Sequence, residues 1–239
     1  MQAPPSPRVG HPVMYHRWSN ITFLHWRYPV ETIRALVPDQ LTVETCDGTA
    51  WVGMTPFLMQ DVRAPGLPVL PWVSSFPETN LRTYVRDRHG RPGIWFFSLD
   101  AGRLPAAVAG RATYWLPYHW SDMSVQVEAG HWRYRCSRIW PGARGAHCDA
   151  ESKIGPALAE DELDELPYFL TARFRLFSQV AGRLITAEVE HAPWPLYRAE
   201  LLELDQTLLR AAGLPAPGHD PLVHASTGVP VRVGMWRPV

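Results

Sequence analysis

Four polar side chains that can bind or activate a small molecule lie close together near the middle of the chain. Glu78, Asn80, Arg82 and Arg86 fall within nine residues, beside two strand-like stretches of sequence. An ionised carboxylate or guanidinium is costly to bury unless it is paired or meets a ligand. If Glu78 and Arg82 point inward, we therefore expect each of them to have an internal partner or a ligand.

Further along the chain, a phenol and an imidazole stand next to each other in the sequence. Together with a carboxyl group, these side chains can move protons near neutral pH. An arginine guanidinium can hold a substrate carboxylate by two parallel hydrogen bonds. The candidate catalytic residues are Glu78, Tyr118 and His119, and the candidate substrate-binding residues are Arg82, Asn80 and Arg111.

Every one of these candidates also has a structural interpretation. The acid, the phenol and the imidazole can form a satisfied polar network inside the protein. The arginines can form internal salt bridges with Glu78 or Asp100, and Asn80 can cap a turn. Both interpretations stay open at the level of the sequence.

Other kinds of chemistry have little support. Five histidines are scattered without a carboxylate at ligand spacing, so we expect no metal site; they are His16, His25, His119, His131 and His191. No glycine-rich nucleotide motif is present, and we expect no cofactor. Lys153 is the single lysine among 23 basic residues, and nearby Glu151 favours its charged form, which opposes a nucleophilic role.

The composition indicates a globular protein. The chain has 239 residues, of which 46% are hydrophobic and 19% charged, and its net charge is +0. A chain without net charge has no general attraction for nucleic acid or an anionic membrane. Three irregularly spaced cysteines, with no secretory leader at the start of the sequence, favour reduced thiols and a cytoplasmic location. We predict a flexible proline-rich arm at 1–13 and a single domain at 14–239.

A β-hairpin forms the centre of the predicted fold, with strands at 81–85 and 94–99. A short helix is predicted at 104–111, and the proline-rich segment 62–71 is predicted as a loop that can lie over a pocket. The remaining predicted strands are 18–28, 41–44, 50–59, 113–115, 123–128, 132–139, 171–177, 184–189 and 229–236. Segment 141–150 is predicted as a loop, and 196–204 fits a strand or a helix equally. This pattern is typical of a β-rich α+β domain, and closing the sheet would hide its edges.

Seven short motifs occur in an order that resembles the YqjF-like family of uncharacterised bacterial proteins. They are V-P-D-Q-L at 37–41, F-x-E-x-N at 76–80, R-T-Y-V at 82–85, S-L-D-A at 98–101, L-P-Y at 116–118, F-L-T-x-R at 169–173 and H-A-P-W-P-L at 191–196. The resemblance covers about residues 14–236. That family is similar to the acetoacetate decarboxylase-like superfamily, which implies a cone-shaped, mostly antiparallel β-barrel with a central pocket and short peripheral helices. It also implies that homo-oligomers can form.

Acetoacetate decarboxylase acts through a lysine that forms a Schiff base with the substrate. By resemblance, Tyr118 and His119 stand where its two neighbouring lysines would be, while Glu78 matches its pocket acid. The resemblance therefore implies a pocket that keeps the acid but lacks the Schiff-base lysine.

Three functions are open on this basis. The first is binding of a small carboxylate or carbonyl compound in the barrel. The second is a lyase or isomerase that uses Glu78 and His119 as acid and base. The third is a structural oligomer with a filled barrel. Fold analogy cannot choose between them.

Overall fold

The structure is a computed structural model that describes residues 5–239. Residues 1–4, part of the predicted arm, lie outside the described residues. The end of that arm belongs to the folded domain. Val9 is buried and its backbone N–H donates to Glu190 Oε2 at 2.8 Å, and the first strand begins at Pro12.

The described chain forms one sheet of fourteen strands with a few short helices at its margins. The strands are β1 (Pro12–Tyr28), β2 (Thr42–Val43), β3 (Thr45–Cys46), β4 (Thr49–Arg63), β5 (Phe76–Arg86), β6 (Pro92–Ala101), β7 (Tyr118–Glu128), β8 (His131–Trp140), β9 (His147–Ala157), β10 (Arg175–Val180), β11 (Arg183–His191), β12 (Leu196–Gln206), β13 (Leu222–Gly234) and β14 (Arg237–Pro238). The helices are α1 (Val30–Arg34), α2 (Leu104–Tyr114), α3 (Glu165–Thr171) and α4 (Leu208–Ala211), with one 3-10 turn at Glu160–Glu162.

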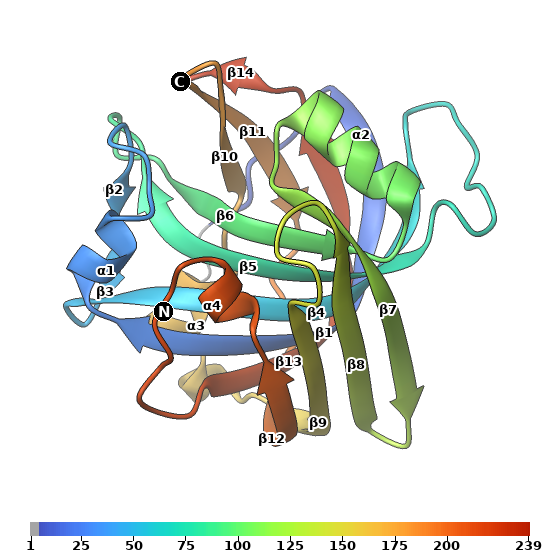
Figure 1. Ribbon diagram of the computed structural model, residues 1–239, viewed down its shortest axis with the longest axis vertical. Helices are drawn as coiled ribbons and strands as arrows, with labels where there is room; N and C mark the ends of the chain where they lie inside the picture. The colour runs from blue at the N-terminus through green and yellow to red at the C-terminus, as the bar shows by residue number, and fades with distance from the viewer. Residues whose placement is uncertain (1–4) are drawn as a thin grey trace.

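The sheet closes on itself as a ring. Pairing runs from β6 through β7, β8, β9, β12, β13, β1 and β4 to β5, and β5 pairs again with β6. Strands β10 and β11 bridge the ring, because β10 pairs with β6 and β11 pairs with β13. Most pairs are antiparallel, the exceptions being β6 with β7 and β6 with β10. The predicted β-rich α+β fold with a closed sheet and peripheral short helices is confirmed (Figure 1).

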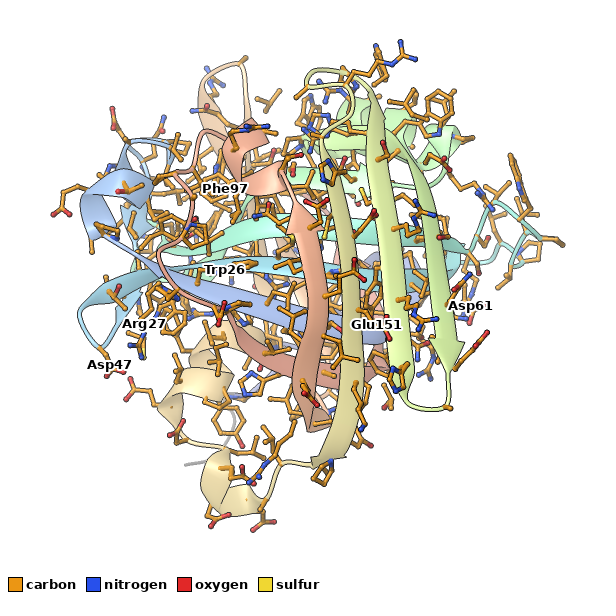
Figure 2. All side chains as sticks on the ribbon, turned by 60° about the horizontal axis from the view of Figure 1, so that its bottom comes forward. Trp26, Arg27, Asp47, Asp61, Phe97 and Glu151 are labelled. Carbon is orange, nitrogen blue, oxygen red and sulfur yellow. The ribbon has the colours of Figure 1, made fainter. Side chains whose placement is uncertain are left out.

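The shared strands β13, β1, β4, β5 and β6 separate two interior regions, one closed by β7, β8, β9 and β12 and the other by β10 and β11. Strand β1 serves both, since its successive side chains point to opposite faces. Phe23 packs with the residues around one region, and Leu24 and Trp26 pack into the larger core on the other side. All three are almost completely buried, as expected for a strand covered on both faces. Figure 2 shows Trp26 within the body of the molecule and Asp47 and Asp61 at its periphery.

The strand predicted at 171–177 begins late, because Thr171 ends helix α3 and β10 starts at Arg175. Two further local predictions are wrong. Segment 113–115 is not a strand, because α2 continues to Tyr114 and Trp115 ends it in a left-handed conformation with φ 51°. Segment 141–150 is not wholly a loop, because β9 begins at His147 and pairs with both β8 and β12. In both places tertiary contacts override the local sequence preference. The segment 196–204, which was open between two states, lies within strand β12.

Two segments cover one end of the ring. Helix α2 lies over the strands at that end, and the segment between β4 and β5 projects from the body as a long loop (Figure 1). This loop includes most of the proline-rich segment that was predicted to lie over a pocket. Its residues Leu67, Leu70 and Val73 line the cavity described next.

Candidate functional site

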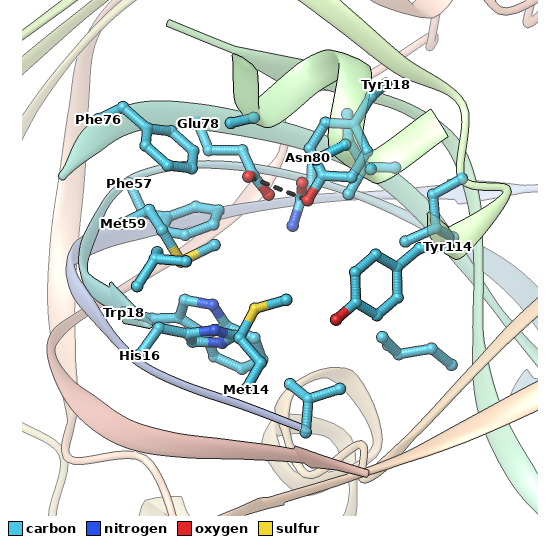
Figure 3. Close-up of a pocket in the computed structure, with 18 of the residues that line it drawn as sticks. Met14, His16, Trp18, Phe57, Met59, Phe76, Glu78, Asn80, Tyr114 and Tyr118 are labelled. Carbon is cyan, nitrogen blue, oxygen red and sulfur yellow. Dashed lines mark hydrogen bonds between the residues drawn. The ribbon is translucent and has the colours of Figure 1, made fainter. Parts of the chain in front are cut away.

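A cavity of about 600 Å³ lies in the region enclosed by β1, β4, β5, β6, β10, β11 and β13. Its wall is largely apolar and aromatic, and Figure 3 shows Met14, Trp18, Phe57, Met59 and Phe76 around it. Concave, mostly apolar sites of a few hundred cubic ångströms, with a few polar groups, are typical of small-molecule binding. The polar groups of the wall therefore define what the cavity can bind.

Strand β5 supplies the main polar groups by its regular alternation. Phe76, Glu78, Asn80 and Arg82 are two residues apart, so they share one face of the strand, and all four line the cavity. The neighbouring strands β4 and β6 pair with β5 on either side and fix its position. Three residues of the predicted polar cluster are thus displayed into the cavity by one central strand. The fourth, Arg86, is not in the wall and donates to Glu44 Oε1 at 2.6 Å.

Glu78 is the acid of the cavity and is only 2% exposed. Burial raises the pKa of its carboxyl group to about 8, against a smaller opposite effect of the Tyr118 hydrogen bond, and the charge of Asp100 raises it further. The Tyr118 hydroxyl donates to Glu78 Oε2 at 3.2 Å, the dashed line in Figure 3. At neutral pH the side chain is therefore mostly protonated and can donate a hydrogen bond to a ligand.

Arg82 is the cation of the cavity. It is 7% exposed, its Nη2 donates to the Leu170 carbonyl at a long 3.4 Å, and its Nε has no hydrogen-bond partner. The salt bridge considered from the sequence, with Glu78 or Asp100, is absent among the described residues. Asp100 instead accepts from Arg138 at 2.8 and 2.7 Å. Arg82 thus keeps an unneutralised charge, and Asn80 beside it has an unpartnered Oδ1.

A second arginine in the wall, Arg173, differs from Arg82 because it has a carboxylate partner within the protein. Its guanidinium donates to Glu44 Oε2 at 2.6 Å, so its charge is neutralised within the protein. Sequence reasoning did not identify Arg173 as a wall residue, because its position follows from the short connection after α3 and from pairing with a residue far away in the sequence.

Sequence reasoning also missed the imidazole of His16. It lines the cavity, both of its ring nitrogens lack a partner, and burial lowers its pKa to about 3, which keeps it neutral. Met14, His16 and Trp18 are each two residues apart in β1, so they share one face of the strand. The predicted strand began at residue 18; a longer one would have placed His16 on the same face as Trp18.

Two candidate residues lie outside the cavity wall. His119 follows Tyr118 in β7 and so faces the other side of the strand, where its Nδ1–H donates to the Pro141 carbonyl at 2.6 Å. Arg111 donates to the Tyr118 carbonyl at 2.9 Å and lies over the Trp140 ring. The structure thus brings Glu78 and Tyr118 together with Arg82 and Asn80, but places neither His119 nor Arg111 with them.

The single lysine and a group of metal-binding side chains are not found at this site. Lys153 is exposed on β9 and is not a wall residue. Within residues 5–239, no three metal-binding side chains are grouped so that they could hold an ion. A helix with the length and apolarity needed to cross a membrane is likewise not found in this part of the chain.

Solved structures identify the class of fold. Acetoacetate decarboxylase from Legionella pneumophila aligns with a TM-score of 0.65 and 14% identity, over 100% of this chain and 92% of its own. The enduracididine biosynthesis enzyme MppR, complexed with pyruvate, aligns with a TM-score of 0.66 and 14% identity, over 95% of this chain and 90% of its own. The closed sheet with its internal cavity is an acetoacetate decarboxylase-like fold, as the resemblance implied.

Sequence comparison identifies the family. Residues 15–230 match the DUF2071 family, described as an uncharacterized conserved protein. The uncharacterized protein YqjF of Bacillus subtilis (strain 168) is 38% identical over 212 residues, which is 89% of this chain and 86% of that protein. The chain belongs to the DUF2071 family, and the predicted YqjF-like relationship is confirmed.

Proposed function

We propose that this protein binds a small, partly apolar carboxylate or carbonyl compound inside the closed sheet. The observation that carries the proposal is Arg82, a buried guanidinium in the cavity wall with no carboxylate partner among the described residues. A buried cation without a counter-ion is unfavourable, so an anionic ligand would be bound strongly there. The apolar remainder of the wall suits the body of the same ligand.

Further support comes from the groups next to Arg82. The protonated Glu78 can donate to a carbonyl oxygen, and Asn80 Oδ1 can accept from a hydroxyl or amide group. The structurally similar MppR was solved with pyruvate, a carboxylate with an adjacent carbonyl group. The cavity volume of about 600 Å³ argues against the alternative of a filled barrel.

Part of the proposal is that no Schiff base forms in the cavity. Lys153 is exposed and away from the wall, and the positions implied for the catalytic lysines hold Tyr118 and His119. Borohydride treatment of the protein with a 2-oxo acid or acetoacetate should therefore trap no adduct. Mass spectrometry that detects a reduced adduct on Lys153 would contradict this.

The ligand proposal is tested by arginine substitutions. Short and medium-chain carboxylates and 2-oxo acids are titrated, and binding is followed through tryptophan fluorescence, since Trp18 and Trp194 lie in the wall. Arg82→Gln should weaken the best ligand by about tenfold to a hundredfold, because a charge-assisted hydrogen bond contributes about 1.5–3 kcal/mol. Arg82→Lys keeps the charge without the planar fork and should restore part of the affinity.

Arg111→Gln is the matched control, because Arg111 lies outside the cavity. It should leave affinity unchanged. Equal affinity of the Arg82→Gln, Arg111→Gln and unsubstituted proteins, with the fold intact, would show that Arg82 is structural and would overturn the proposal.

A second candidate function is supported by the pKa of Glu78. A carboxylic acid with a pKa of about 8 that holds a hydrogen bond from Tyr118 can exchange a proton with a bound carbonyl compound at neutral pH. His119 takes no part in this proposed reaction, because it lies outside the cavity wall. The test is NMR detection of deuterium uptake next to the carbonyl group of 2-oxo acids in D₂O. Exchange that requires Glu78 and is lost in Glu78→Gln would support an enzyme; exchange at the uncatalysed rate would exclude it for these compounds.

A further inference from the structure

The acid and the cation of the cavity occupy separate positions along its wall. Glu78 and Arg82 share the inner face of β5, and Arg82 comes four positions after Glu78. The pairing of this stretch with β4 is regular, so the strand keeps its ordinary length here. At about 3.3 Å per residue, the two Cα atoms are roughly 13 Å apart.

The two side chains also lean to opposite sides of β5. The Glu78 carboxyl group accepts from the hydroxyl of Tyr118, on β7, which lies beyond β6 (Figure 3). The Arg82 guanidinium lies 5.8 Å from the centre of the Phe23 ring, on β1, which lies beyond β4 on the other side. The lean of the side chains therefore keeps the two polar ends apart.

The electrostatics of the wall agree with this separation. Burial is the main reason that the pKa of His191 is lowered, and the charge of Arg82 lowers it further. The pKa of Glu78 is set first by burial, then by the Tyr118 hydrogen bond and the charge of Asp100, and not by Arg82. A nearby cation would lower the pKa of a carboxyl group. Glu78 thus lies beyond the reach of the Arg82 charge.

The wall beside this stretch of β5 is mostly apolar. Phe57 of β4 pairs with Glu78, Leu99 of β6 pairs with Asn80, and both line the cavity. Asn80, midway between the two ends, adds one amide group. Such a wall suits a chain of methylene groups better than a compact polar molecule.

Helix α3 closes the cavity at the Arg82 end. The carbonyl of the fully buried Leu170 accepts from Arg82 Nη2 and from the Tyr84 hydroxyl. Glu78 lies nearer the other end, because β5 begins at Phe76, directly after the loop whose leucines line the cavity. A ligand carboxylate therefore belongs at the closed end, and a second polar group belongs towards the loop.

We propose that the ligand is a medium-chain carboxylic acid that carries a second oxygen group, a carbonyl or a hydroxyl, at a distance from its carboxylate. This inference rests on the proposed binding function. A hydrogen bond of about 3 Å at each end leaves roughly 7 Å or more for the ligand to span. With C–C bonds of about 1.5 Å in a zigzag chain, that span needs about five or more carbon atoms between the two groups. An acid with its carbonyl next to the carboxylate reaches one end only.

The experiment compares three ten-carbon acids, which are decanoate, 2-oxodecanoate and 9-oxodecanoate. The two oxo acids are isomers that differ only in the position of the carbonyl group. Each is titrated at pH 6.5 and followed through tryptophan fluorescence. We expect 9-oxodecanoate to bind about threefold to tenfold more tightly than the other two, in the range of one net hydrogen bond. Equal affinities, or tighter binding of 2-oxodecanoate, would overturn the inference without the need for a variant.

Substitution of Glu78 tests the same ratio of affinities between 9-oxodecanoate and decanoate. Glu78→Met removes the donor and should bring the ratio close to one. Glu78→Gln keeps an N–H donor and should keep most of the ratio. Glu128→Met, at an exposed position, is the matched control and should leave the ratio unchanged. A ratio that persists in Glu78→Met would overturn the role of Glu78.

Arg82→Gln separates a failure of this inference from a failure of the proposed function. It should weaken all three acids alike, because each has the same carboxylate. If the three acids bind equally well and all depend on Arg82, the proposed function holds and the inference is wrong. If the affinity of none of them depends on Arg82, the proposed function itself is wrong.

Discussion

Glu78 owes its protonation state to the burial of its carboxyl group in the cavity wall. Its pKa in the folded protein is about 8, whereas an exposed glutamate titrates near 4.5. Between these pH values the folded state holds a proton that the unfolded state has lost. Stability must therefore decrease as the pH rises through this range, with a slope of about 1.4 kcal/mol per pH unit for one proton.

This effect is measurable between pH 6.5 and 8. Below pH 6.5, buried histidines such as His16, whose pKa is lowered by burial, contribute stability that increases with pH and so opposes the signal. We expect Glu78→Gln to remove most of the decrease in the free energy of unfolding over this window, measured by urea denaturation. Glu128→Gln, at an exposed position, is the control and should keep the original slope. An unchanged slope in Glu78→Gln would mean that Glu78 is ionised in the folded protein.

Gly110 controls the approach of Tyr118 to Glu78. A Cβ atom at this α2 position would overlap the Tyr118 ring. We expect Gly110→Ala to displace that ring and to destabilise the fold by about 1–3 kcal/mol through overpacking. Because the Tyr118 hydrogen bond lowers the pKa of Glu78, its loss should raise that pKa further, which ¹³C NMR of the carboxyl group can follow.

Tyr118→Phe is the comparison variant for Gly110→Ala. It removes the hydroxyl group that Gly110→Ala displaces, and it adds no atom that overlaps the ring. It should therefore raise the pKa of Glu78 but destabilise the fold less than Gly110→Ala. If the Glu78 resonance titrates identically in all three proteins, the 3.2 Å hydrogen bond does not influence the acid.

At the scale of elements, a buried ion pair connects strands that are not neighbours in the sheet. Asp100 at the end of β6 accepts two hydrogen bonds from Arg138 of β8, across β7, and one from the Ser121 hydroxyl at 2.8 Å. Both charged side chains are almost fully buried. The pair holds the end of β6 against β7, close to where Tyr118 enters the cavity.

Removing one partner of this pair should be costly. Arg138→Ala leaves the Asp100 charge buried without compensation, and we expect a loss of about 3–5 kcal/mol in the free energy of unfolding. Arg133 is also on β8 and forms a pair with Glu151 of β9 at the surface. Arg133→Ala breaks this pair and should change stability little. Chemical denaturation of both variants checks this, and similar losses in the two would refute the structural role of the buried pair.

At the scale of the whole molecule, the interior consists of one packed region and one hollow region. Leu24 belongs to the packed core, whereas Leu99 lines the cavity, and both are at most 2% exposed. Leu24→Ala should cost about 3–5 kcal/mol, because it creates a new void in a packed core. Leu99→Ala should cost less than about 2 kcal/mol, since its side chain already lacks contacts on the cavity side. Equal losses in thermal or urea unfolding would mean that the cavity wall is packed as tightly as the core.

Features with a local cause were predictable from the sequence. The hairpin of β5 and β6 follows from apolar runs separated by glycine, proline and aspartate, and its polar residues fall on one face because a strand alternates with period two. The predicted strand began only at residue 81, so the shared face of Glu78, Asn80 and Arg82 follows from the longer strand β5, which begins at Phe76. The family, and through it the class of fold, also follows from short motifs spread along the chain.

Features that depend on pairing between distant segments required the tertiary structure. Strand β9 has a polar sequence and is a strand because β8 and β12 supply its hydrogen bonds from both sides. His119 lies outside the cavity because the register of β7 against β6 turns its neighbour Tyr118 inward. Arg82 keeps a free charge because Asp100, the partner the sequence suggested, is taken by Arg138 from two strands away. Strand alternation is encoded locally, but the ring closes through contacts between segments far apart in sequence, and those contacts decide which charges face the cavity.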